Sequence, residues 1–218
     1  MIQELEKNMK LQLALDIMSY EQSLALIEKV ADYIDIVEIG TPFILEEGMK
    51  PVRDFKKRFP QLKVFADTKI MDAGDIEATS AFKAGADIAT VLGVTDIATI
   101  ISCIEAAKKF NKKIVVDMIC VNNMEGKIKE LERIGVNGLA VHTGVDQQKS
   151  GRTPIDDLKV MKKISKKSEI YVAGGIELKT IGKYTKYYPD VLIVGGGICS
   201  ADNPALAAKL ISEKIKSV

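Results

Sequence analysis

Residues 62–72 read LKVFADTKIMD, a short apolar run that ends in a cluster of charged side chains. Similar runs recur along the chain, and their starts lie roughly 20 to 32 residues apart. Each run is rich in Val, Ile and Leu and lacks regular polar alternation, which is typical of strands buried on both faces. The eight runs are residues 11–15, 34–39, 62–66, 88–92, 114–116, 138–141, 170–173 and 191–194.

Segments with helical periodicity separate these runs. Ser19 is suited to cap a helix that continues to Ala31, and Pro204 suits the first turn of a final helix. Further helices are predicted over residues 95–110, 124–134 and 154–165.

Strand and helix thus alternate eight times. An open doubly wound sheet and a closed barrel both accommodate such a pattern, but eight units favour closure. We predict an α/β fold with one domain, a (β/α)8 TIM barrel over residues 9–218, preceded by a short N-terminal extension over residues 1–8.

Composition excludes several classes of protein. The chain has 218 residues, 47% of them hydrophobic, and a net charge of +1, so neither general disorder nor a nucleic-acid partner is expected. The most membrane-like stretch, residues 88–107, is interrupted by Gly93 and Asp96 and is better explained by a strand, a turn and a helix. The N-terminus does not resemble a signal peptide, and three widely spaced cysteines predict a reducing cytoplasm.

The predicted strand ends carry the polar residues. In a (β/α)8 barrel the active site lies at the C-terminal ends of the strands. An isolated acidic residue there is usually a loop residue or a helix cap. Five such groups converging on one mouth cost stability, so function explains them better. The five are Asp16, Glu38, Asp67, Asp117 and His142.

Two of these ends give the sharpest signals. Asp67 and Lys69 lie two residues apart on a strand, so they point to the same side and stabilise each other's charge; a surface ion pair is the alternative. His142 is the only histidine and suits a general base or acid, although a core or loop histidine has the same appearance in a sequence.

Glycines follow the last two predicted strands. In barrels, the loops after strands 7 and 8 commonly bind phosphate through backbone N–H groups, and glycine allows a close approach. Tight turns are the alternative. The candidates are Gly174, Gly175, Gly196 and Gly197. Glu38 and Asp67 are candidate oxygen ligands for Mg²⁺.

Together these motifs resemble the orotidine 5'-monophosphate decarboxylase superfamily and, within it, the 3-hexulose-6-phosphate synthase family. The resemblance runs from Met9 onward and is carried by VFADTKIMDAGDIEA (64–78), VHTGVDQQ (141–148), VAGGI (172–176) and VGGGI (194–198). The alternative is the 3-keto-L-gulonate-6-phosphate decarboxylase family. That family typically has arginines after the strand-6 histidine and the strand-8 glycine, and Glu at the end of strand 5. Here those places hold Thr143-Gly144-Val145, Gly196-Gly197 and Asp117, while Arg152 does not match.

The resemblance implies a reversible, Mg²⁺-dependent aldol condensation of formaldehyde with the phosphosugar D-ribulose 5-phosphate, giving D-arabino-hex-3-ulose 6-phosphate through an enediolate. Mn²⁺ is expected to replace Mg²⁺. A barrel that binds a phosphosugar without turnover is the third reading. The implied roles are His142 as base, Lys69, Asp67 and Asp72 as further catalytic residues, Glu38 and Asp67 as metal ligands, Asp16 and Asp117 for substrate hydroxyls, and the four glycines for phosphate. The resemblance also implies a homodimer in which Asp72 reaches the partner's site.

Overall fold

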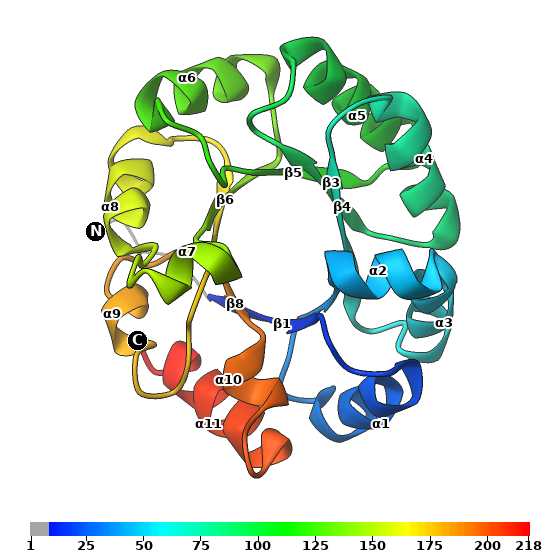
Figure 1. Ribbon diagram of the computed structural model, residues 1–218, viewed down its shortest axis with the longest axis vertical. Helices are drawn as coiled ribbons and strands as arrows, with labels where there is room; N and C mark the ends of the chain where they lie inside the picture. The colour runs from blue at the N-terminus through cyan, green and yellow to red at the C-terminus, as the bar shows by residue number, and fades with distance from the viewer. Residues whose placement is uncertain (1–8) are drawn as a thin grey trace, which may run out of the picture.

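Eight parallel strands close into a barrel in the order β1 to β8, with β8 paired to β1 (Figure 1). The computed structural model describes residues 9–218, so the extension predicted over residues 1–8 lies outside the described residues. The predicted TIM barrel is confirmed. The strands are β1 (Lys10–Leu15), β2 (Ile36–Ile39), β3 (Lys63–Ile70), β4 (Ile88–Leu92), β5 (Lys113–Asp117), β6 (Gly138–His142), β7 (Glu169–Ala173) and β8 (Val191–Val194).

Helices surround the barrel (Figure 1). The five helices predicted from periodicity are confirmed as α1 (Tyr20–Val30), α5 (Ile97–Phe110), α6 (Met124–Ile134), α8 (Ile155–Ile164) and α11 (Pro204–Lys216). Six others were not predicted, and several are too short to show periodicity. They are α2 (Thr41–Glu47), α3 (Lys50–Arg58), α4 (Gly74–Ala84), α7 (Val145–Lys149), α9 (Gly182–Thr185) and α10 (Gly196–Cys199).

Local side chains fix where the predicted helices begin. Ser19 caps α1 and forms a capping box with Gln22, in which each side chain bonds the other's backbone N–H. Helix α5 begins two residues after Thr95, because Asp96 is its cap and accepts a hydrogen bond from the backbone N–H of Ala98.

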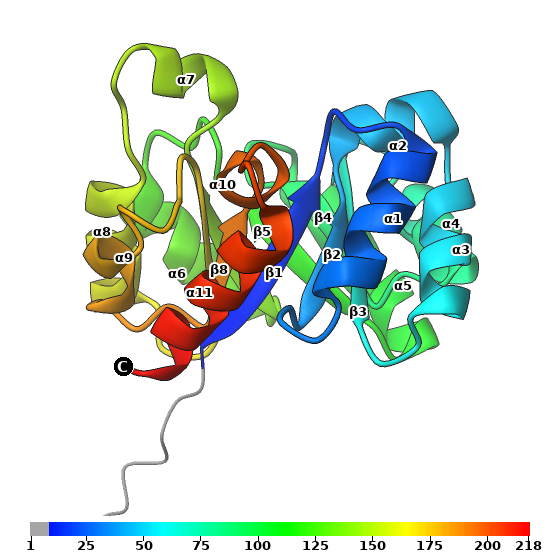
Figure 2. The same cartoon turned by 90° about the horizontal axis from the view of Figure 1, so that it is seen from below.

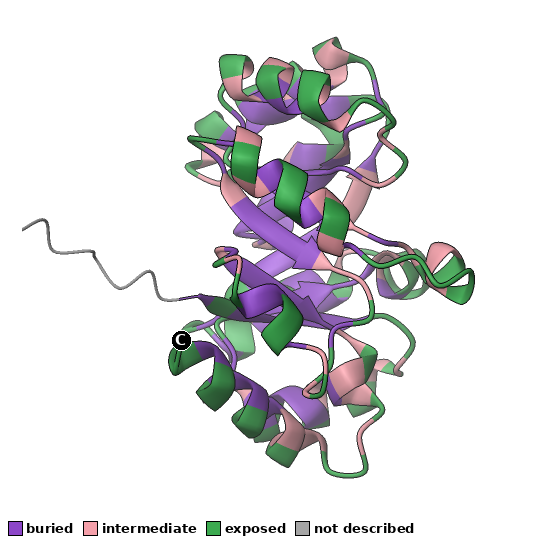
Figure 3. Cartoon of the chain, turned by 90° about the vertical axis from the view of Figure 1, so that its left-hand side faces the viewer, coloured by how far each residue is buried: buried purple, intermediate pink, exposed green. Residues whose placement is uncertain are grey.

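Alternation along each strand produces two apolar regions. In β1, Leu11, Leu13 and Leu15 pack in the large cluster between strands and helices, whereas Ala14 belongs to a second cluster inside the barrel. Figure 3 shows buried strands between helices whose outer faces are exposed. Inward-pointing residues near the strand ends are therefore directed toward the barrel mouth.

Strand β3 is longer than predicted. It was expected to end at Asp67 but continues to Ile70, and its pairing with β4 shifts between Ala66 and Ile70. Lys69 has a φ of 45° within this irregular segment. Here a side-chain hydrogen bond takes the place of regular backbone pairing with β4. Thr90 Oγ1 accepts a hydrogen bond from the Lys69 backbone N–H at 2.9 Å. This irregular extension places Lys69 at the barrel mouth.

Helix α7 stands apart from the other elements. Figure 2 shows it projecting beyond the end of the barrel, and none of its residues is buried. Within residues 9–218, no helix combines the length and apolar character needed to cross a membrane.

Candidate functional site

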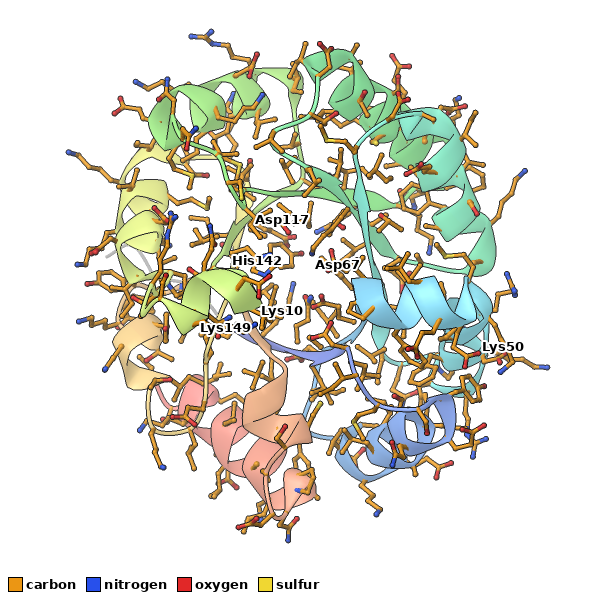
Figure 4. All side chains as sticks on the ribbon, viewed as in Figure 1. Lys10, Lys50, Asp67, Asp117, His142 and Lys149 are labelled. Carbon is orange, nitrogen blue, oxygen red and sulfur yellow. The ribbon has the colours of Figure 1, made fainter. Side chains whose placement is uncertain are left out.

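A cavity of about 920 Å³ opens at the C-terminal end of the strands. Figure 4 shows Asp67, Asp117 and His142 directed toward the middle of the barrel. The barrel thus brings together residues that are far apart in the sequence. The predicted site residues that line the cavity are Asp16, Glu38, Asp67, Lys69, Asp117, His142, Gly174, Gly175, Gly196 and Gly197.

Lys69 bridges two carboxylates in this cavity. Its Nζ lies 2.5 Å from Oδ2 of Asp67 and 3.3 Å from Oδ2 of Asp117. Burial alone would lower the pKa of Lys69, but the charges of Asp67 and Asp117 outweigh burial and raise that pKa. Lys69 is therefore a stable cation, suited to stabilise negative charge and poorly suited to act as a neutral amine nucleophile.

His142 is oriented by Asp117. Its Nδ1 lies 2.8 Å from Oδ2 of Asp117, which is 3% exposed and whose Oδ1 accepts the backbone N–H of Ile119 at 2.9 Å. Burial alone would raise the pKa of Asp117, but the hydrogen bond to His142 and the charges of His142 and Lys69 outweigh it, so that pKa is lowered. A carboxylate partner favours the proton on Nδ1 and leaves Nε2 with its lone pair.

The structure adds a role for Asp117 that the sequence did not predict. Both of its oxygens bond to protein groups, and the bond to Nδ1 makes Asp117 the group that orients His142. Asp117 also lines the cavity, and its contact with substrate hydroxyls, which the resemblance implied, stays a prediction.

Glu38 and Asp67 form the candidate metal site. Glu38 is 6% exposed, and burial, followed by the nearby charge of Asp67, raises the pKa of Glu38 well above its usual range. Asp67 accepts hydrogen bonds from Thr90 Oγ1 at 2.8 Å and Thr41 Oγ1 at 2.9 Å. Two neighbouring buried carboxylates repel each other, and a divalent cation between them would offset that repulsion.

The oxygen donors fit Mg²⁺ better than a softer metal. Within residues 9–218, no group of three or more His, Cys, Asp or Glu side chains is arranged to hold an ion. Mg²⁺ is usually bound through one or two carboxylates and completes its shell with water or substrate oxygens. A site of Glu38 and Asp67 has this character, although Lys69 also bonds Asp67.

Close packing makes glycine necessary in the two phosphate-loop candidates. Gly174 has a φ of +124°, and a Cβ there would lie 2.7 Å from the carbonyl oxygen of Thr143. A Cβ at Gly197 would lie 2.5 Å from the carbonyl oxygen of Ile176. Larger residues would therefore push these loops apart. The four glycines also line the cavity, so phosphate binding there stays a prediction beside the confirmed close packing.

Asp72 does not join the cavity. It is exposed, and its Oδ1 accepts the backbone N–H of Ala73 at 2.7 Å. Its predicted action in a partner's site stays a prediction.

Sequence reasoning missed four polar residues that support the site. Thr41 and Thr90 bond Asp67, and Gln12 donates from Nε2 to Oε2 of Glu38 at 2.6 Å. Gln148 of α7 donates to the carbonyl oxygen of Thr143 at 2.8 Å. Gln12 and Thr90 could have been found from the sequence, since each is a polar residue inside an apolar strand.

The chain is similar to known proteins over most of its length. The Orotidine 5'-phosphate decarboxylase / HUMPS family matches residues 9–211. The 3-hexulose-6-phosphate synthase of Bacillus subtilis is 47% identical over 207 residues, covering 95% of this chain and 99% of that protein.

Solved structures give a similar result. The crystal structure of 3-hexulose-6-phosphate synthase from Salmonella typhimurium has a TM-score of 0.94 and 49% identity, covering 95% of this chain and 98% of that one. The crystal structure of 3-keto-L-gulonate-6-phosphate decarboxylase from Vibrio cholerae has a TM-score of 0.85 and 27% identity, covering 96% and 98%. The likeness to the decarboxylase is the weaker of the two.

Proposed function

Since this chain belongs to the Orotidine 5'-phosphate decarboxylase / HUMPS family, we propose that it catalyses the aldol condensation of formaldehyde with D-ribulose 5-phosphate. The product is D-arabino-hex-3-ulose 6-phosphate, and the reaction is reversible. The observation that carries this proposal is the 47% identity to a 3-hexulose-6-phosphate synthase over nearly the whole of both chains. The grouping of base, cation and carboxylates in one cavity supports it.

The first chemical step is proton removal from C1 of ribulose 5-phosphate. Nε2 of His142 takes this proton, and the Asp117 carboxylate 2.8 Å from Nδ1 stabilises the imidazolium that forms. The resulting enediolate carries negative charge, which the Lys69 ammonium stabilises.

The second step joins the two substrates. The C1 carbon of the enediolate attacks the carbon of formaldehyde, and the formaldehyde oxygen takes up the proton held by His142. One C–H bond and the π bond of the formaldehyde carbonyl are broken, and one C–C and one O–H bond are formed, so bonds and protons balance. Bound Mg²⁺, held by Glu38 and Asp67, would supply additional positive charge beside the substrate oxygens.

The remaining predicted residues bind the sugar. The loop of Gly174–Gly175 and the first turn of α10, which contains Gly196 and Gly197, are proposed to hold the phosphate, and Asp16 and Asp117 the hydroxyls. A Cβ at position 40 would clash with the Asp16 carboxylate, so Gly40 leaves room for the Asp16 side chain in its present position.

A homodimer is proposed on the basis of the surface around Asp72. Met71 is 53%, Ile76 72% and Val94 44% exposed, although all three are large and apolar. Thr95 Oγ1 donates to the carbonyl oxygen of Met71 at 2.5 Å, which ties the two loops together. Ile76→Asp should convert the dimer to a monomer in sedimentation velocity, whereas Val160→Asp on α8 should not. A monomeric parent protein would remove the proposal.

The activity is tested by incubating the purified protein with formaldehyde, ribulose 5-phosphate and Mg²⁺. We expect formaldehyde to be consumed only when ribulose 5-phosphate is present. EDTA should abolish the activity, and Mg²⁺ or Mn²⁺ should restore it. A protein that binds ribulose 5-phosphate and metal but consumes no formaldehyde would instead fit the non-catalytic reading.

A cytoplasmic location is proposed for the protein. The three cysteines are free thiols, which supports this proposal.

The alternative substrate is 3-keto-L-gulonate 6-phosphate. Its decarboxylation also passes through an enediolate, so slow turnover is compatible with the proposal. A kcat/KM for CO₂ release higher than that for formaldehyde consumption would reverse the assignment.

A further inference from the structure

A fully buried amide lies inside the barrel, below the cavity. Gln12 of β1 is 0% exposed, and the residues in register with it are Ile36 of β2 and Ile193 of β8. Both belong to the apolar cluster that fills the barrel interior. An amide is costly in such surroundings unless its hydrogen bonds are made, so packing alone would favour Leu or Met at this position.

The Gln12 amide nitrogen bonds Glu38, whereas the amide oxygen makes no hydrogen bond among the described residues. Nε2 of Gln12 donates to Oε2 of Glu38 at 2.6 Å, a short bond to a 6% exposed carboxyl group. Oε1 of Gln12 has no hydrogen-bond partner among the described residues. The buried amide is thus only half satisfied, and the half that is satisfied is the bond to Glu38.

The hydrogen bond from Gln12 restrains the Glu38 side chain, which the Asp67 carboxylate repels. Glu38 lines the cavity together with Asp67, and the charge of each carboxylate repels the other unless a divalent cation lies between them. Residues that hydrogen-bond a metal-binding carboxylate from outside fix its orientation, and their loss typically weakens metal binding. Gln12 does not line the cavity, so it acts on the site only through Glu38.

We propose that Gln12 is a positioning residue that holds the Glu38 carboxylate in the orientation needed to bind a divalent cation. This inference rests on the proposed function, because it requires the metal site of Glu38 and Asp67. It adds a residue from the barrel interior to a site otherwise built at the strand ends.

The experiment measures Mn²⁺ affinity, with no substrate present, in the full-length protein and in two variants. Gln12→Met keeps the approximate size but removes the donor, and Gln12→Asn keeps an amide but withdraws it from Glu38. Free Mn²⁺ is followed by electron paramagnetic resonance during titration. We expect both variants to bind Mn²⁺ about 10- to 100-fold more weakly than the parent.

Tyr171→Phe is the matched control. Tyr171 lies in the same interior cluster, is 1% exposed and donates its hydroxyl to Glu169 at 3.2 Å instead of Glu38. Its loss should leave the Mn²⁺ affinity unchanged. A purely structural role for Gln12 would lower the unfolding temperature of its variants without a selective loss of Mn²⁺ affinity.

The outcomes separate this inference from the proposed function. If the parent binds no Mn²⁺, the metal site and the role of Gln12 are both overturned. If the parent binds Mn²⁺ and both variants bind within threefold of it, only the role of Gln12 is overturned. Thermal unfolding shows whether each variant folds; should Gln12→Met not fold, Gln12→Asn decides, and failure of both to fold would assign Gln12 a structural role instead.

Discussion

Replacing Asp117 with Asn tests how His142 acts as a base. Asn has nearly the same shape but no charge, so the imidazolium formed during proton removal loses its counterion. Nδ1 of His142 lies 2.8 Å from the carboxylate. At an effective dielectric constant of about 20, a pair of unit charges at this distance interacts by about 6 kcal/mol, which sets an upper limit near 10⁴-fold in rate.

The expected loss is about 10³- to 10⁴-fold in kcat, since charge delocalisation over the imidazole and carboxylate reduces the full value. The assay is formaldehyde consumption at saturating ribulose 5-phosphate and Mg²⁺. Asp157→Asn, which removes a partly exposed partner of Arg152, should retain full activity. A folded Asp117→Asn protein that loses less than tenfold in kcat would refute the assignment of His142 and Asp117 as a functional pair.

Three further predictions follow from other contacts. Lys69→Met should lower kcat by several orders of magnitude, because it removes the cation next to the enediolate; a loss under tenfold would argue against that role. Gly174→Ala should raise the KM for ribulose 5-phosphate at least tenfold, since a Cβ would lie 2.7 Å from the Thr143 carbonyl oxygen; an unchanged KM in steady-state kinetics would separate this loop from phosphate binding. Asp87→Asn should destabilise the protein by about 2–4 kcal/mol at pH 7 in urea denaturation, because the ammonium groups of Lys56 and Lys112 lose the carboxylate that neutralises them. Burial alone would raise the pKa of Asp87, but the hydrogen bonds from Lys112 and Lys56 outweigh it and lower that pKa. The stability that its charge contributes is therefore present above the unfolded pKa of about 3.9 and lost as the pH falls through the lower folded value. The difference between variant and parent should shrink below about pH 4, and a constant difference would contradict the ionic explanation.

The barrel could be predicted from the sequence because its signal is local and repeated. Apolar runs mark all eight strands, and the closed architecture follows from their number. The sequence predicted that Lys69 lies beside Asp67, which the cavity confirms, but it did not predict the backbone conformation of Lys69. Its φ of 45° depends on the bond from its backbone N–H to Thr90 of the neighbouring strand, which is a tertiary contact.

The sequence predicted several of the residues that line the cavity, but not the hydrogen bonds between them. Strand-end positions were sufficient to bring Asp16, Glu38 and His142 to one cavity. The partner of each group depends on rotamers and on neighbouring strands, so the sequence did not indicate that Asp117 bonds His142. Nor did it indicate that Gln12 bonds Glu38, because a single polar residue in an apolar strand stands out but does not show which side chain it contacts.

In the proposed reaction, His142 removes the C1 proton of ribulose 5-phosphate before any carbon–carbon bond forms. This step is measured directly by NMR in D₂O, with protein, Mg²⁺ and ribulose 5-phosphate but no formaldehyde. We predict that one C1 proton exchanges for deuterium with the parent protein and that His142→Asn abolishes the exchange. No exchange with a parent protein that consumes formaldehyde, or undiminished exchange with His142→Asn, would contradict the account.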